Sequence, residues 1–174
     1  MEIRALRESD DRSRFRSGDP DLDRFLAKYA GQNQFRHHIG VTYVALDDAG
    51  VILGFATVAP ASIEIEDLPA AERRKLPRYP LPVLRLARLA VDEPSRGQGV
   101  AKALLRFVLV LALRLAQDFG CAGIVVDAKP EAATFYEAFG FEPLEVLSGR
   151  SAARPAPVIL FLPLSAVEAV RAGR

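Results

Sequence analysis

Cysteine is nearly absent from this sequence: Cys121 is the only one among 174 residues, so no disulfide can form within the chain. A lone cysteine suits a reducing compartment. No histidine follows Cys121 in the chain, so we expect a small buried side chain rather than a nucleophile. An excess of one charge is also missing, because the formal net charge is only +1. This balance gives no strong attraction to nucleic acid or to a membrane, although it permits a local basic patch.

Long hydrophobic runs are missing as well. The most apolar segment, residues 100–119, contains four charged side chains and therefore cannot span a bilayer. The first residues lack the apolar run and the cleavage site of a signal peptide. Two adjacent histidines, His37 and His38, would point in different directions on a helix, so we predict no metal site. We expect a cytoplasmic protein with a single domain over residues 1–174.

The order of apolar and polar residues predicts a mixed α/β fold. Strands are predicted over residues 2–7, 41–46, 51–58, 83–91, 123–127, 142–147 and 158–162. Helices are predicted after Asp19-Pro20 and over residues 70–76, 100–119 and 131–139. Antiparallel strands come first, and strand–helix–strand–helix and a closing pair follow. This order favours a central mixed, mostly antiparallel, twisted sheet of about seven strands with about four flanking helices.

A turn with two glycines precedes the longest predicted helix, in the string Arg96-Gly97-Gln98-Gly99-Val100-Ala101. Free backbone N–H groups and the positive end of the helix dipole form an anion site there, and glycine lets a phosphate approach closely. The pattern therefore predicts phosphate binding over residues 97–101. A P-loop motif is absent, and a dinucleotide fingerprint would need glycine in place of Lys102. A plain turn before a core helix is the alternative.

Two blocks resemble the GNAT acetyltransferases. The turn is similar to the Gln/Arg-x-x-Gly-x-Gly/Ala coenzyme A loop of that family, and residues 132–141 are similar to its Ala-x-x-Phe-Tyr-x-x-x-Gly-Phe block. The resemblance implies the GNAT fold, with the sheet splayed at the coenzyme A site, and acetyl-CoA as co-substrate. The Val91 N–H would hold the acetyl carbonyl, and Lys129 stands where many members have asparagine. The implied cofactor-binding residues are Leu89, Ala90, Val91, Arg96, Gly97, Gln98, Gly99, Val100, Ala101, Lys129 and Phe135.

The same resemblance implies that Tyr136 is the acid that protonates the leaving thiolate. The alternative is an aromatic pair, Phe135-Tyr136, packed in the core. The predicted strand 83–91 carries no carboxylate that could serve as a base. Either Glu64 or Glu66 acts through water, or the acceptor is an α-amine, which is partly neutral at pH 7 because its pKa is about 7.7–8.0.

Further strings resemble GNAT toxins of type II toxin–antitoxin modules: residues 15–26, 32–34, 82–92 and 126–129. This resemblance implies transfer to the α-amine of aminoacyl-tRNA and a ribbon-helix-helix antitoxin as partner, and a homodimer is compatible with it. Arg85 and Arg88 would then face the substrate. A second patch could join them, although each charge could equally be a solvated surface residue; its members are Arg73, Arg74, Lys75 and Arg78. The alternatives are an acetyltransferase for a small amine or a protein N-terminus, and a non-catalytic binding module.

Overall fold

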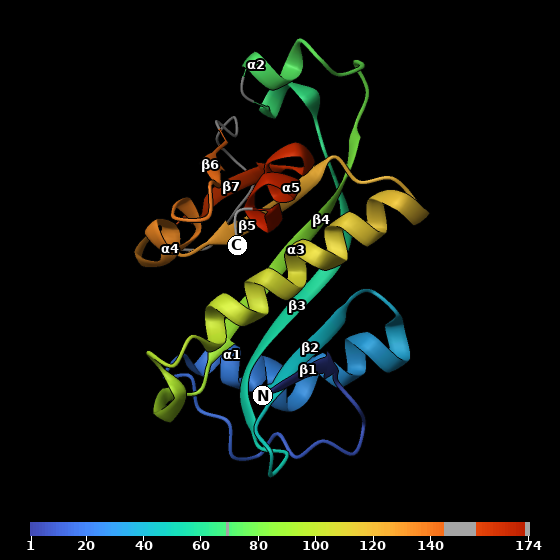
Figure 1. Cartoon of the computed structure of the whole chain (residues 1–174). Coiled ribbons are helices and arrows are strands. Elements are labelled where there is room, and N and C mark those ends of the chain that lie inside the picture. The colour runs from blue at the N-terminus through green and yellow to red at the C-terminus, as the bar shows by residue number, and fades with distance from the viewer. Residues whose placement is uncertain (69, 145–155, 173–174) are drawn as a thin grey trace. The chain divides into compact units, whose positions relative to one another are not determined.

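The computed structural model describes residues 1–68, 70–144 and 156–172, and it contains one seven-stranded sheet with the order β1-β2-β3-β4-β5-β7-β6 (Figure 1). The strands are β1 (Glu2–Ala5), β2 (Val41–Leu46), β3 (Ile52–Ile63), β4 (Leu81–Val91), β5 (Gly123–Ala128), β6 (Glu142–Pro143) and β7 (Val158–Pro163). The α-helices are α1 (Pro20–Arg24), α2 (Ala70–Arg73), α3 (Val100–Asp118), α4 (Ala133–Glu137) and α5 (Leu164–Ala172). The predicted α/β class and the mixed sheet are thus confirmed. Residues 145–147 of the predicted strand 142–147 lie outside the described residues.

By internal contacts the chain divides into two compact units. The first unit comprises Met1–Ala59 and Leu86–Val108, and the second comprises Pro60–Arg85 and the described part of Leu109–Arg174. Three elements, β3, β4 and α3, have residues in both units. A single domain over residues 1–174 stays a prediction.

The first unit contains an antiparallel run of β1, β2 and β3. Glu2 pairs with Leu46 between β1 and β2, and Val41 pairs with Val58 between β2 and β3. The turn between β2 and β3 depends on Asp47, whose carboxylate accepts the N–H groups of Ala49 and Val51 at 2.9 and 2.8 Å. Gly50 closes the turn at φ 79°, in the left-handed region that glycine adopts without strain. The hairpin predicted from Asp47 to Gly50 is therefore confirmed.

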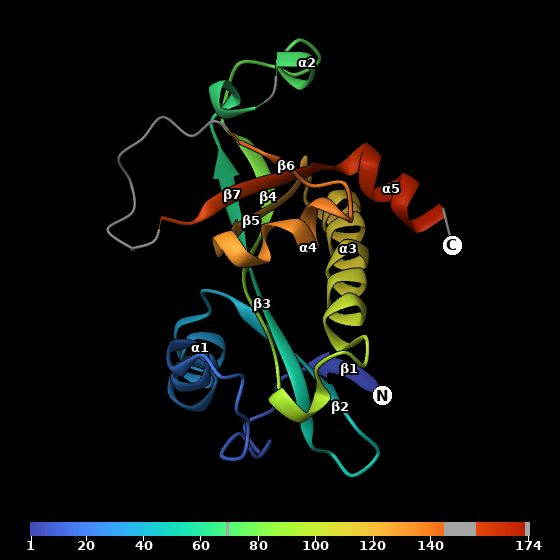
Figure 2. The ribbon, with the colours of Figure 1, turned by 90° about the vertical axis from the view of Figure 1, so that its left-hand side faces the viewer.

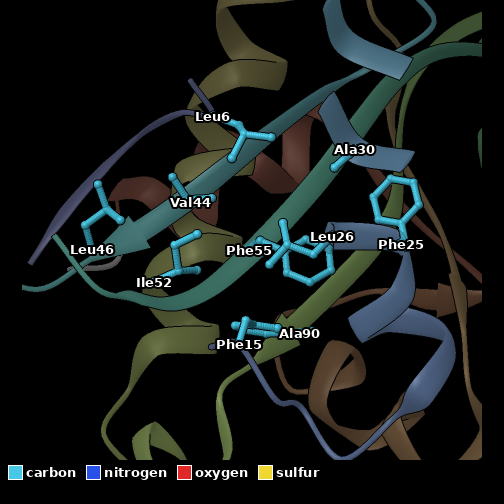
Figure 3. Packing of buried hydrophobic residues seen from close by; sticks show 10 residues of the cluster. All are labelled: Leu6, Phe15, Phe25, Leu26, Ala30, Val44, Leu46, Ile52, Phe55 and Ala90. Atoms are coloured by element: carbon cyan, nitrogen blue, oxygen red, sulfur yellow. The ribbon is translucent and has the colours of Figure 1, made fainter. Parts of the chain in front are cut away.

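Phe55 of β3 stands at the centre of the core of this unit and is fully buried (Figure 3). The ring of Phe15 packs edge-on to it with the centroids 5.4 Å apart, and the ring of Phe25 stacks on it at 6.1 Å. Such aromatic pairs contribute about 0.5–1.5 kcal/mol beyond their buried area. They tie the N-terminal loop and the first helical segment to the sheet.

The first helical segment begins as predicted and then departs from the α-helix. The Asp19 carboxylate caps α1 by accepting the Asp21 N–H at 2.9 Å. Residues 25–29 and 32–37 are π-helical, and the Ala30 N–H donates to the Phe25 carbonyl. The wider π turn moves the buried face by one position, so Ala30 is buried and Tyr29 is 46% exposed. Tyr29 follows Phe25 by four residues, so α-helical spacing would place both on one apolar face, but the exposure of Tyr29 shows that it does not lie there.

The second unit is built around β7, which pairs antiparallel with β5 and with β6. Its core contains Val83 of β4, Val125 of β5 and Phe161 of β7. Residues 64–68 leave the end of β3, and residues 70–80 return to the start of β4; α2 lies within this excursion (Figure 2). Ile65 and Leu68 anchor the excursion in the core of the unit.

Candidate functional site

The predicted phosphate turn joins β4 to α3 inside the first unit. Gly97 and Gly99 have φ values of 77° and 81°, which non-glycine residues adopt only with strain. A Cβ atom added at either glycine would meet no atom within 4 Å, so the turn is open to a ligand. The first backbone bond of α3 runs from the Ala103 N–H to the Gly99 carbonyl at 3.0 Å. The N–H groups before Ala103 therefore have no acceptor within the helix, an arrangement that favours an anion.

Hydrogen bonds attach the turn to the loop that precedes α1. The Arg16 N–H donates to the Asp92 carboxylate at 2.7 Å, and the Glu93 N–H donates to the Arg16 carbonyl at 2.8 Å. The Arg96 guanidinium donates to the Ser17 carbonyl and lies 3.9 Å from the Glu93 carboxylate. Arg96 therefore positions the turn from outside the helix, in addition to any contact with a ligand.

Gly18 lies in close contact with the Arg96 side chain. Gly18 has φ 80°, and a Cβ atom there would stand 2.9 Å from the Arg96 guanidinium. Ser17 is held in turn by Asp23 of α1, which accepts its hydroxyl at 2.6 Å and its N–H at 2.7 Å. Sequence reasoning missed Asp92 and Gly18 as positioning residues. The Gly18-Asp19-Pro20 string was the available signal, because it marks a tight turn before a helix.

Close packing of β3 fixes the start of α3. A Cβ atom on Gly54 would stand 2.9 Å from the Ala90 carbonyl and from Val100 Cγ1. Only glycine leaves space for this approach. Of the predicted cofactor-binding residues of β4, Ala90 is buried, whereas Leu89 and Val91 are half-buried.

The predicted acid, Tyr136, lies on α4 in the second unit and is 5% exposed. Its ring packs edge-on to Phe135 at 5.1 Å and to Phe141 at 5.7 Å. Burial raises the pKa of Tyr136 to about 12, so the hydroxyl keeps its proton at neutral pH. The hydroxyl has no hydrogen-bond partner within the described part of the chain. It is therefore available as a donor to a ligand, while the ring is enclosed.

The predicted substrate arginines are both held by other side chains. Arg85 forms an ion pair with Asp127 in the second unit. The Arg88 guanidinium stands over the Phe25 ring in the first unit, 3.8 Å from its centroid. Burial lowers the pKa of Arg88 from its ordinary value, but an arginine keeps its charge at neutral pH. The other predicted residue of this region, Lys129, is exposed and precedes the short helical turn Pro130–Ala132.

Three arginines of the predicted patch line one cavity of about 430 Å³ in the second unit. Arg73, Arg74 and Arg78 share it with Glu66, one of the two candidate bases. Lys75 lies 3.7 Å from Glu72, with which it forms an exposed ion pair. Glu64, the other candidate base, is exposed.

Cys121 is buried, as predicted, and its thiol donates to the Gly123 carbonyl at 3.2 Å. Burial raises the pKa of this thiol, which keeps it in the unreactive protonated form. Over residues 1–68, 70–144 and 156–172, no group of three or more His, Cys, Asp or Glu side chains could hold a metal ion. None of the helices in the same ranges is both long and apolar enough to cross a membrane.

Comparison with known proteins places this geometry in a family. A family model described as an acetyltransferase (GNAT) domain matches residues 38–143. A tRNA-acetylating toxin of Mycobacterium tuberculosis (strain ATCC 25618 / H37Rv) is 36% identical over 140 residues, which cover 80% of this chain and 82% of the toxin.

Solved structures agree with this placement. AtaT complexed with acetyl-methionyl-tRNAfMet superposes with a TM-score of 0.84 at 27% identity, over 98% of both chains. A Tyr-to-Phe mutant of the AtaT toxin, bound to the C-terminus of the antitoxin AtaR and acetyl-CoA, gives a TM-score of 0.77 at 25% identity, over 98% of this chain and 97% of the other. With the family model matched over more than half of its length, the chain belongs to the GNAT acetyltransferases.

Proposed function

We propose that this GNAT enzyme transfers the acetyl group of acetyl-CoA to the α-amine of an aminoacyl-tRNA. The observation that carries the cofactor half of the proposal is the open turn at Gly97 and Gly99, which leads directly into a helix of 19 residues. The acceptor half is supported by similarity to a tRNA-acetylating toxin over 80% of the chain and by the AtaT complex with acetyl-methionyl-tRNA.

The coenzyme pyrophosphate would bind at the start of α3. Backbone N–H groups from Gly97 to Ala101 would donate to the phosphate oxygens, and the positive end of the α3 dipole would favour their charge. The pantetheine arm would run along Leu89, Ala90 and Val91, with the Val91 N–H donating to the thioester carbonyl. One preorganised donor of this kind contributes roughly 10²–10³ in rate.

Tyr136 would assist the departure of the thiolate. A phenol with a pKa of about 12 is fully protonated at pH 7 and available as a donor. Complete transfer of its proton to a thiolate would be uphill, because a thiol has a pKa of about 8.5. We therefore infer that the hydroxyl donates a hydrogen bond to the sulfur as charge develops. The final proton would come from the nitrogen of the tetrahedral intermediate, which becomes cationic when the neutral amine attacks.

The amine needs little help to become nucleophilic. The charged residues of β4 are Arg85 and Arg88, and the strand carries no carboxylate. An α-amine with a pKa near 7.7–8.0 is neutral in a substantial fraction at pH 7, whereas a lysine amine with a pKa near 10.4 is not. An α-amine acceptor therefore fits a strand without a base.

Contacts with RNA phosphates would come from Arg85, Arg88 and the arginines around Glu66. We further infer that an antitoxin covers this chain, as AtaR binds AtaT, and that the enzyme acts in the cytoplasm, where charged tRNA is found. The catalytic function would belong to one domain over residues 1–174.

The test is acetyl-CoA turnover against charged tRNAs, free amino acids, small amines and peptides with free N-termini. We expect charged tRNAs to be acetylated fastest and the Tyr136→Phe variant to be nearly inactive on them. If small amines turn over well while every charged tRNA is inert, the acceptor is wrong and the acetyl-CoA part stands. Absence of turnover with every acceptor, together with retained acetyl-CoA binding, would favour a binding module.

A further inference from the structure

A second cavity, in the first unit, gathers positive side chains that the proposed reaction does not use. It has a volume of about 380 Å³, and we call it the basic cavity. Arg12 comes from the loop after β1, and Lys28 and Arg36 come from the helical segment that follows α1. Glu8 is the one carboxylate in its lining.

The three cations of the basic cavity outnumber the one carboxylate in its lining, Glu8. Within the described ranges, Arg12, Lys28 and Arg36 form no ion pair, and their side chains make no hydrogen bond. Two other carboxylates of the same loop are engaged elsewhere. Asp10 accepts the Arg4 guanidinium at 2.7 and 2.8 Å, and Asp11 accepts the Ser13 hydroxyl at 2.6 Å. Three like charges around one cavity repel one another, and an anionic ligand would relieve that repulsion.

A glycine makes room for the guanidinium of Arg12. Gly31 has helical backbone angles, φ −64° and ψ −42°, at a position where alanine would favour the helix more strongly. A Cβ atom at Gly31 would stand 2.7 Å from Arg12 Nη1 and 3.7 Å from the Phe35 ring. Glycine therefore lowers the helix propensity at this position, but it lets the guanidinium lie directly against the helix. This close fit distinguishes Arg12 from a freely solvated surface arginine.

We propose that the basic cavity binds phosphate groups of RNA. Guanidinium groups match phosphate oxygens in pairs. Lys28 and Arg36 are eight residues apart along the helical segment, more than one helical turn, so they can meet different phosphates of one strand. A polyanion is also the ligand that the proposed function supplies, and the identification of this RNA as tRNA rests on that function. Because the net charge is only +1, binding of RNA requires a local cluster of positive side chains such as this one.

The experiment measures binding of deacylated tRNA by fluorescence anisotropy at several salt concentrations. Each phosphate contact contributes about 0.7–0.9 to the slope of log affinity against log salt. We expect the double variant Arg12→Gln/Arg36→Gln to bind more weakly and its slope to become shallower by about 1.4–1.8, the sum for two contacts. Arg24→Gln is the matched control, because Arg24 is exposed in the same unit and pairs with Asp21.

Gly31→Ala provides a test that leaves the charge unchanged. The added methyl group would displace the guanidinium of Arg12 while improving helix propensity. We expect tRNA affinity to fall several-fold while the melting temperature stays level or rises, which excludes unfolding as the cause.

Three results would overturn the proposal. The first is an unchanged salt slope in the double variant. The second is an equal loss of tRNA affinity in Arg24→Gln, which would reflect overall charge. The third is a parallel loss of acetyl-CoA affinity, which would assign the cavity to a coenzyme phosphate. Because deacylated tRNA cannot be acetylated, this measurement is independent of the transfer assay. If charged tRNA fails as acceptor while the slope changes as expected, the proposed function is wrong and the phosphate site stands.

Discussion

Tyr136 combines an enclosed ring with a hydroxyl that has no partner within the described part of the chain, and the two features can be separated by mutation. Tyr136→Phe keeps the ring contacts with Phe135 and Phe141 at 5.1 and 5.7 Å and removes only the donor. We expect turnover to fall on the order of 10²–10³-fold, the usual cost of losing one preorganised donor, while acetyl-CoA affinity and melting temperature change little. Steady-state kinetics, calorimetry and thermal melts measure the three quantities. Tyr79→Phe is the control, because Tyr79 is 61% exposed. If the turnover of Tyr136→Phe is unaltered under conditions in which the chemical step is rate-limiting, Tyr136 has only a packing role.

Two glycines with the same backbone conformation allow the effect of backbone strain to be measured apart from the effect on ligand binding. Gly99 has φ 81° and Gly50 has φ 79°, and a Cβ atom at either would meet no atom within 4 Å. Substitution by valine should therefore lower the free energy of unfolding by a similar amount at both positions, about 1–2 kcal/mol, because valine is strained in the left-handed conformation. Only Gly99→Val should also lose acetyl-CoA affinity, because the side chain would stand where the pyrophosphate approaches. Calorimetry on both folded variants provides the comparison. Equal affinities would argue against a phosphate site at this turn.

The sequence identifies residues whose role depends on their neighbours along the chain, such as Gly97, Gly99 and the Asp19 cap. It cannot reveal contacts between distant positions. The bond from the Arg16 N–H to Asp92 spans 76 residues, and the Arg88 guanidinium meets Phe25 only in the folded unit. The expectation that Arg88 faces a substrate could not anticipate its contact with an aromatic ring.

Elements differ in how far the sequence predicts them. The long apolar helix and the hairpin at Asp47 follow from local pattern and turn chemistry. Prolines set the expected end of β3 too early and the expected start of β4 too late, because β3 continues past Pro60 to Ile63 and β4 begins before Pro82. Pro82 lacks an N–H group, but its carbonyl accepts the Ala122 N–H at 2.7 Å, so the strand tolerates it. The π turns escaped prediction because their extra residue changes the helical period, and α5 was not predicted at all.

The packing of α3 on β3 depends on the missing side chain of Gly54. In Gly54→Ala the new methyl group would stand 2.9 Å from the Ala90 carbonyl and from Val100 Cγ1. We expect a loss of about 1–3 kcal/mol in the free energy of unfolding, the usual cost of overpacking. Because the start of α3 must shift, acetyl-CoA affinity should fall as well. Urea denaturation and calorimetry measure these effects.

A second substitution makes that test specific. Val100→Ala removes the methyl group closest to the new one, while the contact with the Ala90 carbonyl remains. The double variant Gly54→Ala/Val100→Ala should therefore recover part of the lost affinity. Additive losses in the double variant would show that Gly54 does not act through the start of α3.

At the scale of the whole molecule, three elements run through both compact units. Residues of β3, β4 and α3 belong to each unit, so neither can unfold without breaking elements of the other. We therefore expect one cooperative transition in urea. The four tyrosines provide local probes, since Tyr29 and Tyr43 belong to the first unit and Tyr79 and Tyr136 to the second. The variant Tyr29→Phe/Tyr43→Phe keeps only the tyrosines of the second unit, and Tyr79→Phe/Tyr136→Phe keeps only those of the first. Their tyrosine fluorescence should give the same urea midpoint once it is corrected for any difference in overall stability between the two variants. Separate midpoints would divide the chain into two domains.

Acetyl-CoA should stabilise both units, even though the glycine turn belongs only to the first. A ligand that binds only the native state raises the free energy of unfolding by RT ln(1 + [L]/Kd), about 2.7 kcal/mol at one hundred times Kd. If unfolding is cooperative, the same increase should appear in the tyrosine probes of either unit. The Gly99→Val variant is the control, because it should gain much less stability at the same ligand concentration. Stabilisation confined to the probes of the first unit would mean that the second unfolds independently, so that Tyr136 would belong to a domain whose stability does not depend on the cofactor turn.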